Sequence, residues 1–222
     1  NQPWSNRQST PVSLDNQTAT TFEIGARGDS LIGLWDLAYY YAQVKHELLS
    51  IEIEPNIFAE SNASPTVHQG LEVGLVSQLW QGDELGALAL RQAYTFSDFH
   101  YRDDDTFGDN RLPGLPQHYY QGELRYQHPA GVYFGLNAQY ASEVPVDYAN
   151  SWHADAYRTF GATLGYDSPK RDWQTWLELR NLTDERYAAT VTPGYNDNGV
   201  EAARLTPGEG FGVYTGFSWS WL

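Results

Sequence analysis

The stretch VYFGLNAQY, Val132–Tyr140, decides the fold class because its apolar residues recur at every second position. One set of alternate residues reads Val, Phe, Leu, Ala and Tyr, and the other reads Tyr, Gly, Asn and Gln. Tyr119–Gln127 and Thr159–Tyr166 alternate in the same way. A period of two residues fits a strand with one apolar and one polar face and does not fit a helix. The chain is therefore predicted to be all-β.

The same alternation continues along the chain and predicts about nine strands. Most exceed the roughly 5–6 residues usual in soluble sheets and reach the roughly 9–11 residues that cross a bilayer at a tilt. The predicted strands are Thr18–Gly28, Leu31–Ile51, Thr66–Trp80, Leu85–Tyr101, Gln117–Gln127, Val132–Val144, Tyr157–Tyr166, Trp173–Tyr187 and Phe211–Leu222.

The connections between these strands alternate strictly between short and long. The short ones are 28–30, 81–83, 128–131 and 168–171, and the long ones are 52–65, 102–116, 145–156 and 188–210. Outer-membrane barrels have short periplasmic turns and longer extracellular loops, whereas a soluble sandwich mixes its loop lengths. The pattern favours an antiparallel up-and-down transmembrane β-barrel, and a soluble β-sheet binding protein remains the alternative.

The composition narrows the function classes. The chain has 28 acidic and 13 basic residues, a formal net charge of −15, which argues against a nucleic-acid partner. It has no cysteine and no methionine, so disulfides and sulfur-ligated metal sites are excluded. No stretch reaches the roughly 18 apolar residues of a transmembrane helix. The 16 Tyr and 8 Trp residues suit a membrane–water interface.

The expected strand number is odd, whereas bacterial single-chain barrels use even numbers. A sheet with two long free edges is an aggregation hazard. Either one strand is missed, or the chain is a piece of a larger barrel whose remainder pairs with both edges. The start at Asn1 has no apolar leader, so we expect a removed signal peptide or an N-terminus that lies elsewhere.

The last strand and the segments before it carry a family resemblance. Phe217, Trp219 and Trp221 share one apolar face, and Leu222 ends the chain; this is similar to the C-terminal signal by which outer-membrane barrels are recognised for assembly. Asn181–Tyr187 reads NLTDERY and Leu205–Phe211 reads LTPGEGF, with a long polar loop between them. This order resembles the TonB-dependent receptor family, although Phe211 stands where that family commonly has arginine. Arg111–His118 and Asp147–Ser151 are also similar to family segments.

The resemblance implies the C-terminal part of a barrel of about 22 strands. Residues 1–222 would form one portion of that barrel wall, without the N-terminal plug domain and the N-terminal strands. The implied function is TonB-dependent uptake of a scarce solute (a siderophore, a metal chelate or a cofactor-like small molecule) across the Gram-negative outer membrane. The implied partners are the small-molecule ligand, the remaining N-terminal part of the receptor, TonB through the plug, outer-membrane lipid and lipopolysaccharide, and the barrel assembly machinery. A passive porin or other small barrel is a second alternative.

Chemistry-bearing residues are few. No nucleophile–base arrangement, phosphate loop or metal-ligand spacing is present, so we expect no enzyme, no cofactor and no metal site. The acidic run Asp103–Asp105 lacks the glycine and spaced ligands of a calcium loop, and we expect a solvated tip that meets divalent cations at lipopolysaccharide. The candidate ligand contacts are Arg111, His153, Tyr195 and Arg204, because guanidinium and phenol groups can grip an anionic chelate or an organic acid. They could equally be ordinary loop residues.

Overall fold

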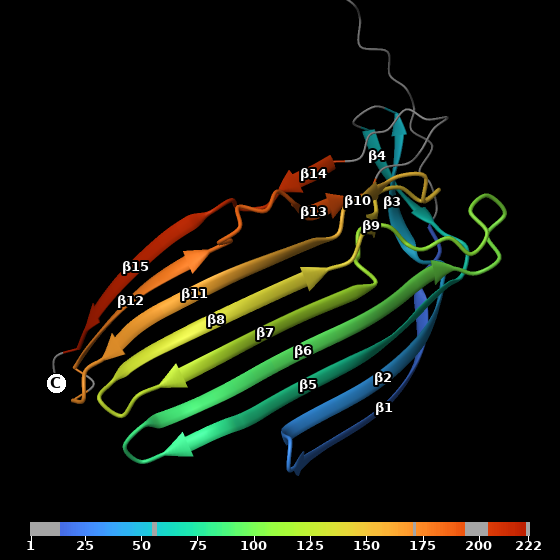
Figure 1. The fold of residues 1–222 in the computed structure, drawn as a ribbon. Coiled ribbons are helices and arrows are strands. Elements are labelled where there is room, and N and C mark those ends of the chain that lie inside the picture. Colours follow the sequence, from blue (N-terminus) through green and yellow to red (C-terminus); the bar gives the residue numbers. More distant parts are fainter. Residues whose placement is uncertain (1–13, 55–56, 171, 194–203, 221–222) are drawn as a thin grey trace, which may run out of the picture.

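The computed structural model describes residues 14–54, 57–170, 172–193 and 204–220 (Figure 1). Its main feature is one antiparallel nine-stranded sheet in the order β1-β2-β5-β6-β7-β8-β11-β12-β15. The strands are β1 (Thr18–Ser30), β2 (Gly33–Lys45), β5 (Thr66–Gly82), β6 (Gly86–Tyr101), β7 (His118–Gln127), β8 (Val132–Ala141), β11 (Tyr157–Asp167), β12 (Trp173–Arg180) and β15 (Gly212–Trp219). Each long strand pairs with the next one in sequence, so the predicted up-and-down meander of nine strands is confirmed. No helix in the described ranges is long and apolar enough to cross a membrane.

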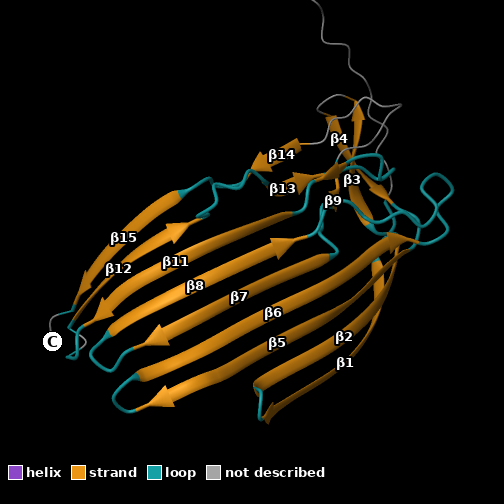
Figure 2. Ribbon diagram, viewed as in Figure 1, coloured by secondary structure: helices purple, strands orange, loops and turns teal. Residues whose placement is uncertain are grey.

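The long connections contain three small hairpins that the sequence did not predict. They are β3 (Leu48–Glu54) with β4 (Ile57–Asn62), β9 (Val144–Pro145) with β10 (His153–Ala154), and β13 (Ala188–Thr192) with β14 (Arg204–Pro207). All three lie at one end of the sheet, which we call the loop end (Figure 2). The other end carries only tight turns and the C-terminal end of β15, and we call it the turn end (Figure 1).

Two predicted strands are shorter than the alternation indicated. The predicted strand Leu31–Ile51 divides, because β2 ends at Lys45 and the chain turns at His46, whose φ is +54°. The predicted strand Trp173–Tyr187 stops at Arg180, because Asn181 adopts a φ of +47°. Left-handed backbone cannot continue a strand. The apolar alternation ends before both positions, because Gln43 and Lys45 follow Tyr41, and Asn181 follows Leu179, on the side that is apolar earlier in each strand.

The register sorts the side chains of the sheet onto two faces. Leu124, Leu136, Ala162 and Leu179 form a continuous cross-strand row on one side, which we call the apolar face. Its opposite, the polar face, carries the charged side chains of the strand interiors: Glu23, Arg27, Asp36, Glu72, Arg91, Glu123, Arg125, Glu178 and Arg180. Because strand residues alternate strictly, a slip of one residue would place this charge on the apolar side. The pattern therefore fixes the register.

Aromatic rings on the polar face cover glycines of the neighbouring strands. A Cβ on Gly216 would lie 2.5 Å from Cε2 of Trp176, and the rings of Tyr133 and Trp176 are strand neighbours of Gly165. Glycine at these positions leaves room for a ring to lie flat along the sheet, which fixes the pairing of adjacent strands.

Candidate functional site

The apolar face has a band that suits contact with lipid. Between its two ends the described strands carry no Asp, Glu, Lys or Arg on this face. Gln92 is the polar exception on β6, and its Oε1 accepts a hydrogen bond of 3.1 Å from the Tyr120 hydroxyl. Large apolar side chains stand exposed, with Leu164 51% and Phe217 67% accessible. Such a surface is stable only against an apolar phase.

Aromatic side chains border the band at both ends. The turn end has Trp35, Trp80, Tyr126, Tyr166, Trp173 and Trp219, and the loop end has Tyr39, Tyr41, Tyr94, Phe96, Tyr120 and Tyr140. Several contact one another: Trp80 stacks on Tyr126 at 6.4 Å, and Tyr166 lies 5.0 Å from Trp173 between ring centroids. Tyr and Trp prefer the membrane interface because each has an apolar body and a polar tip. Two belts enclosing an apolar band mark the position of a bilayer.

The residues proposed as an assembly signal lie partly in the described chain. Phe217 and Trp219 point to the apolar face from β15, and they are 67% and 62% exposed. The Phe217 ring stacks on Trp173 at 6.2 Å. Trp221 and Leu222 lie outside the described residues, so the signal stays a prediction.

The polar face has two different regions. On β1 to β7 it carries charged side chains of both signs, and in the described part of the chain Glu72, Arg91 and Glu123 make no ion pair. On β8 and β11 the same face carries no charge before Asp167 at the turn end. The polar face is therefore charged on β1 to β7 and neutral on β8 and β11 as far as Asp167.

The loops at the loop end form a packed layer. Tyr101, Leu112 and Tyr148 are buried together, and the segments 102–117 and 142–156 meet through them. The side chain of Asn150 fastens the two segments: its Oδ1 accepts the Arg111 N–H and its Nδ2 donates to the Arg111 carbonyl, both at 2.9 Å. Asn150 has a φ of +53°, which asparagine tolerates better than most residues. These contacts hold the layer as one unit.

Ionisable groups also stabilise this layer. Glu47 accepts hydrogen bonds from Thr66 and from His68 Nε2, the latter at 3.2 Å. Burial raises the pKa of Glu47, but these hydrogen bonds outweigh it and hold the pKa below its ordinary value. Burial, with the nearby carboxylates Glu47 and Glu60, raises the pKa of Tyr148 to about 12. Near neutral pH the layer therefore holds an ionised Glu47 and a protonated Tyr148.

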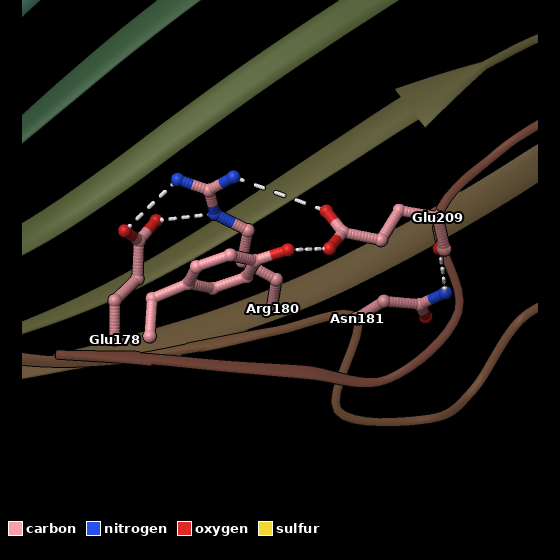
Figure 3. A network of polar contacts seen from close by, with 5 residues as sticks. Glu178, Arg180, Asn181 and Glu209 are labelled. Carbon is pink, nitrogen blue, oxygen red and sulfur yellow. Dashed lines mark hydrogen bonds and ion pairs between the residues drawn. The ribbon is translucent and has the colours of Figure 1, made fainter.

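The NLTDERY and LTPGEGF segments form one joint before the last strand (Figure 3). Asn181 Nδ2 donates to the carbonyls of Glu185 and Glu209, both at 2.9 Å. Asp184 Oδ1 accepts the N–H of Phe211 at 2.9 Å. These bonds fix the point at which the chain enters β15.

An ionic cluster on the polar face continues from this joint (Figure 3). Arg180 pairs with Glu178 through Nε at 2.9 Å and Nη2 at 3.0 Å, and lies 3.8 Å from Glu209. Its guanidinium lies 4.4 Å above the ring of Tyr214, whose hydroxyl donates to Glu209. The cluster ties β12 to β15 by side chains as well as by the ladder.

The four predicted ligand residues belong to the loop end as far as they are described. Arg111 is half-buried and held by Asn150, and His153 is half-buried in β10, paired with Pro145. Arg204 begins β14 opposite Thr192, and its side chain is not described; Tyr195 lies outside the described residues. β10 and β13 share a core through Ala154 and Val191. No hydrogen bond joins the described residues Arg111 and His153. Their role stays a prediction.

The acidic tip Asp103–Asp105 forms a compact turn. Asp104 Oδ1 accepts the N–H groups of Thr106 at 2.8 Å and Phe107 at 2.7 Å, which stabilises the turn. No group of three or more His, Asp or Glu side chains within the described ranges is arranged to hold a metal ion.

A polar hollow of about 680 Å³ lies at the turn end, away from the loops. It is lined by the β7–β8 and β11–β12 turns and by the end of β15. Ser168 donates to the Asp172 carboxylate there, and this hydrogen bond is the main cause that lowers the pKa of Asp172. The hollow lies between neighbouring turns at the edge of the sheet.

Comparison with known proteins identifies the family. Residues 2–182 match the family described as TonB dependent receptor-like, beta-barrel. A probable TonB-dependent siderophore receptor, PiuA of Acinetobacter baumannii, is 25% identical over 187 residues, covering 78% of this chain and 24% of the relative. The ferric yersiniabactin uptake receptor FyuA of Yersinia pestis superposes with a TM-score of 0.70 at 16% identity, covering 90% of this chain and 29% of that one. The copper transporter OprC gives a TM-score of 0.74 at 17% identity, covering 94% and 32%.

The chain thus spans 24% of the curated relative's length and about a third or less of those solved chains. The structural likenesses, at these identities, concern the fold alone. The match to the family covers most of the chain and agrees with the open nine-stranded sheet and its lipid-type face. The chain belongs to the TonB-dependent receptor-like β-barrels, which are proteins of the Gram-negative outer membrane.

Proposed function

We propose that this chain is the C-terminal portion of the barrel wall of a receptor that imports a siderophore or another metal chelate, using energy passed through TonB. The observation that carries the proposal is the open sheet, whose apolar face carries no charged side chain between its two aromatic belts, in a chain of this family. The relative named as a siderophore receptor supports the ligand class. Family members are receptors and transporters, so we propose no catalytic activity for this chain.

The free edges of the sheet support the larger barrel. Within the described sheet, β1 (13 residues) and β15 (8 residues) each pair with one neighbour only. Each unpaired N–H or C=O group inside a membrane costs several kcal/mol. This cost excludes open sheet edges from the hydrocarbon region. We therefore propose that N-terminal strands of the same receptor pair with both edges and close a barrel of about 22 strands. A plug domain, which would contact TonB, belongs with those strands.

The outer surface implies further partners. We propose that the apolar face meets lipid, that the loop end meets lipopolysaccharide, and that Phe217, Trp219, Trp221 and Leu222 contact the assembly machinery. The ligand would approach from the loop end, where Arg111, His153, Tyr195 and Arg204 are the proposed contacts. Substituting all four with alanine in the intact receptor should weaken chelate binding, and an unchanged affinity would remove them from the site.

Uptake in cells tests the function. The intact receptor, expressed in a strain lacking its own siderophore receptors, should accumulate radioactive iron from a panel of ferric chelates. Accumulation should stop when the gene for TonB is deleted. A passive porin would continue to take up small solutes without TonB, and a soluble sheet protein would not fractionate with the outer membrane. The family match disfavours both alternatives, and the apolar band between the aromatic belts disfavours the soluble sheet protein in particular.

A further inference from the structure

A neutral patch of aromatic and amide side chains lies at the loop end of the polar face. Its members share three neighbouring strands and one following segment. In register, Gln121 faces Gln139, and Ala141 lies between Tyr119 and Tyr157 in the next row. Tyr187 stacks on Tyr157 with 4.2 Å between ring centroids. We call the five side chains the Tyr–Gln patch: Tyr119, Gln121, Gln139, Tyr157 and Tyr187.

The hydrogen bonds inside the patch leave several groups unused. Gln139 Nε2 donates to the hydroxyls of Tyr119 at 2.6 Å and Tyr157 at 3.3 Å, and Gln121 Nε2 donates to Tyr119 at 2.8 Å. Both tyrosine oxygens therefore act as acceptors, so their own protons must point elsewhere. Among the described residues neither proton has an acceptor, and neither glutamine Oε1 has a donor. At least the two tyrosine protons and the two glutamine oxygens thus remain for a ligand.

The surroundings of the patch select against a charged anion. The patch contains no ionisable cation, and the polar face of β8 and β11 stays neutral as far as Asp167. On β7 the next polar-face side chain after Gln121 is the carboxylate of Glu123. Arg91 lies opposite Glu123 in register, so a negative ligand would meet neutral dipoles and a pair of opposite charges with no net attraction, whereas an uncharged ligand would lose little on desolvation.

We infer that the Tyr–Gln patch is a binding surface for an uncharged metal chelate that carries both amide or hydroxyl donors and carbonyl-type acceptors. The tyrosine protons would donate to chelate oxygens, and the glutamine carbonyls would accept chelate N–H or O–H groups. The stacked pair Tyr157 and Tyr187 would offer its rings to the apolar edge of the ligand. This inference rests on the proposed function and specifies its substrate class.

Binding to the intact receptor in detergent tests the inference. The probes are the ferric complex of desferrioxamine E, a neutral trihydroxamate, and the ferric complex of enterobactin, a trianion. The test variant is Tyr119→Phe with Tyr157→Phe, which keeps both rings and removes both free protons. The control is Tyr140→Phe, the same change on the apolar face of β8, next to Gln139. Calorimetry gives the affinities, and heat-modifiable gel migration shows that each variant is folded.

The neutral chelate should bind more tightly than the trianion, and the double variant should bind the neutral chelate about tenfold more weakly, since two hydrogen bonds are lost. The control should keep the wild-type affinity. Failure of the neutral chelate to bind, or equal affinities of the double variant and wild type, would overturn the inference. A double variant that keeps its affinity but unfolds at lower temperature would assign the patch to contact with the plug and also overturn it. TonB-dependent uptake of any other chelate would leave the proposed function standing.

Discussion

An arginine placed on the apolar face tests the assignment of that face to lipid. Ala162 on β11 lies four residues before Tyr166, whose ring belongs to the belt at the turn end. At ~3.3 Å per residue and a tilt of about 40° this separation is about 10 Å along the membrane normal. The apolar band of such barrels is about 25 Å tall, so Ala162 lies close to its middle. Its cross-strand neighbours Leu136 and Leu179 offer an arginine no polar partner.

The expected cost follows from that depth. Arginine near the midplane of a barrel costs about 2–4 kcal/mol, which reduces the folded-to-unfolded ratio on the order of a hundredfold. Because alanine is small, Ala162→Arg removes almost no packing, and the loss reports the guanidinium alone. The matched control is Thr163→Arg, one residue along on the polar face and opposite Glu178. A change below about 1 kcal/mol is expected there, as for an ordinary exposed substitution.

Unfolding of the intact receptor in lipid vesicles by guanidinium, followed by tryptophan fluorescence, measures both variants. The difference between the two variants should be about 2 kcal/mol or more. Equal losses at the two positions, or a greater loss at Thr163, would refute the assignment of the faces.

Three further predictions concern the packing of the wall and of its loops. Gly216→Ala should destabilise the receptor by about 1–3 kcal/mol, because the new Cβ overlaps the indole of Trp176. The control Gly135→Ala should leave the melting temperature unchanged, because the nearest atom to its new Cβ is the Cβ of Thr163 at 3.7 Å. Asn150→Ala should expose the 102–117 loop to limited proteolysis, since both bonds to the facing segment are lost; an unaltered cleavage pattern would count against the fastening role. The raised pKa of Tyr148, about 12, predicts a loop layer whose stability is full below pH ~10 and is lost as pH rises toward 12. Tyr148→Phe should abolish that loss in an alkaline titration followed by proteolysis.

The fold could be predicted because the two faces of a membrane barrel require apolar and polar residues to alternate along each strand. The alternation in Val132–Tyr140 and the neighbouring strands, together with the alternating short and long connections, was sufficient to predict nine strands in meander order. The breaks at His46 and Asn181 were missed, because each is made by a left-handed residue whose φ the alternation does not encode. The small hairpins of the loop end were missed for another reason. The strands of the β9–β10 hairpin contain only two residues each, and a core around Val146 that they share with β13 stabilises them more than local propensity does.

The candidate site could be predicted only in part from the sequence. Arginine, histidine and tyrosine side chains were chosen as ligand contacts because guanidinium and phenol groups can grip an anionic chelate or an organic acid, and this choice led to the loops. The Tyr–Gln patch gives no such signal, because Tyr119 and Tyr157 are far apart in the chain and become neighbours only through Ala141. Glutamine and tyrosine on the polar side of a strand are also ordinary wall residues. Only the register of three strands and the count of unused protons separate this patch from the rest of the wall.

The family-like segments around Asn150, Asn181 and Asp184 have a structural explanation. Each of these residues has a positive φ and uses its side chain to satisfy backbone groups of a second segment. These side chains are already hydrogen-bonded to backbone groups, so they cannot at the same time bind a solute. These three side chains therefore report the architecture of the barrel and not the nature of its ligand. Ligand choice must then depend on side chains that these joints leave unused, which is the property that singles out the hydroxyls of Tyr119 and Tyr157.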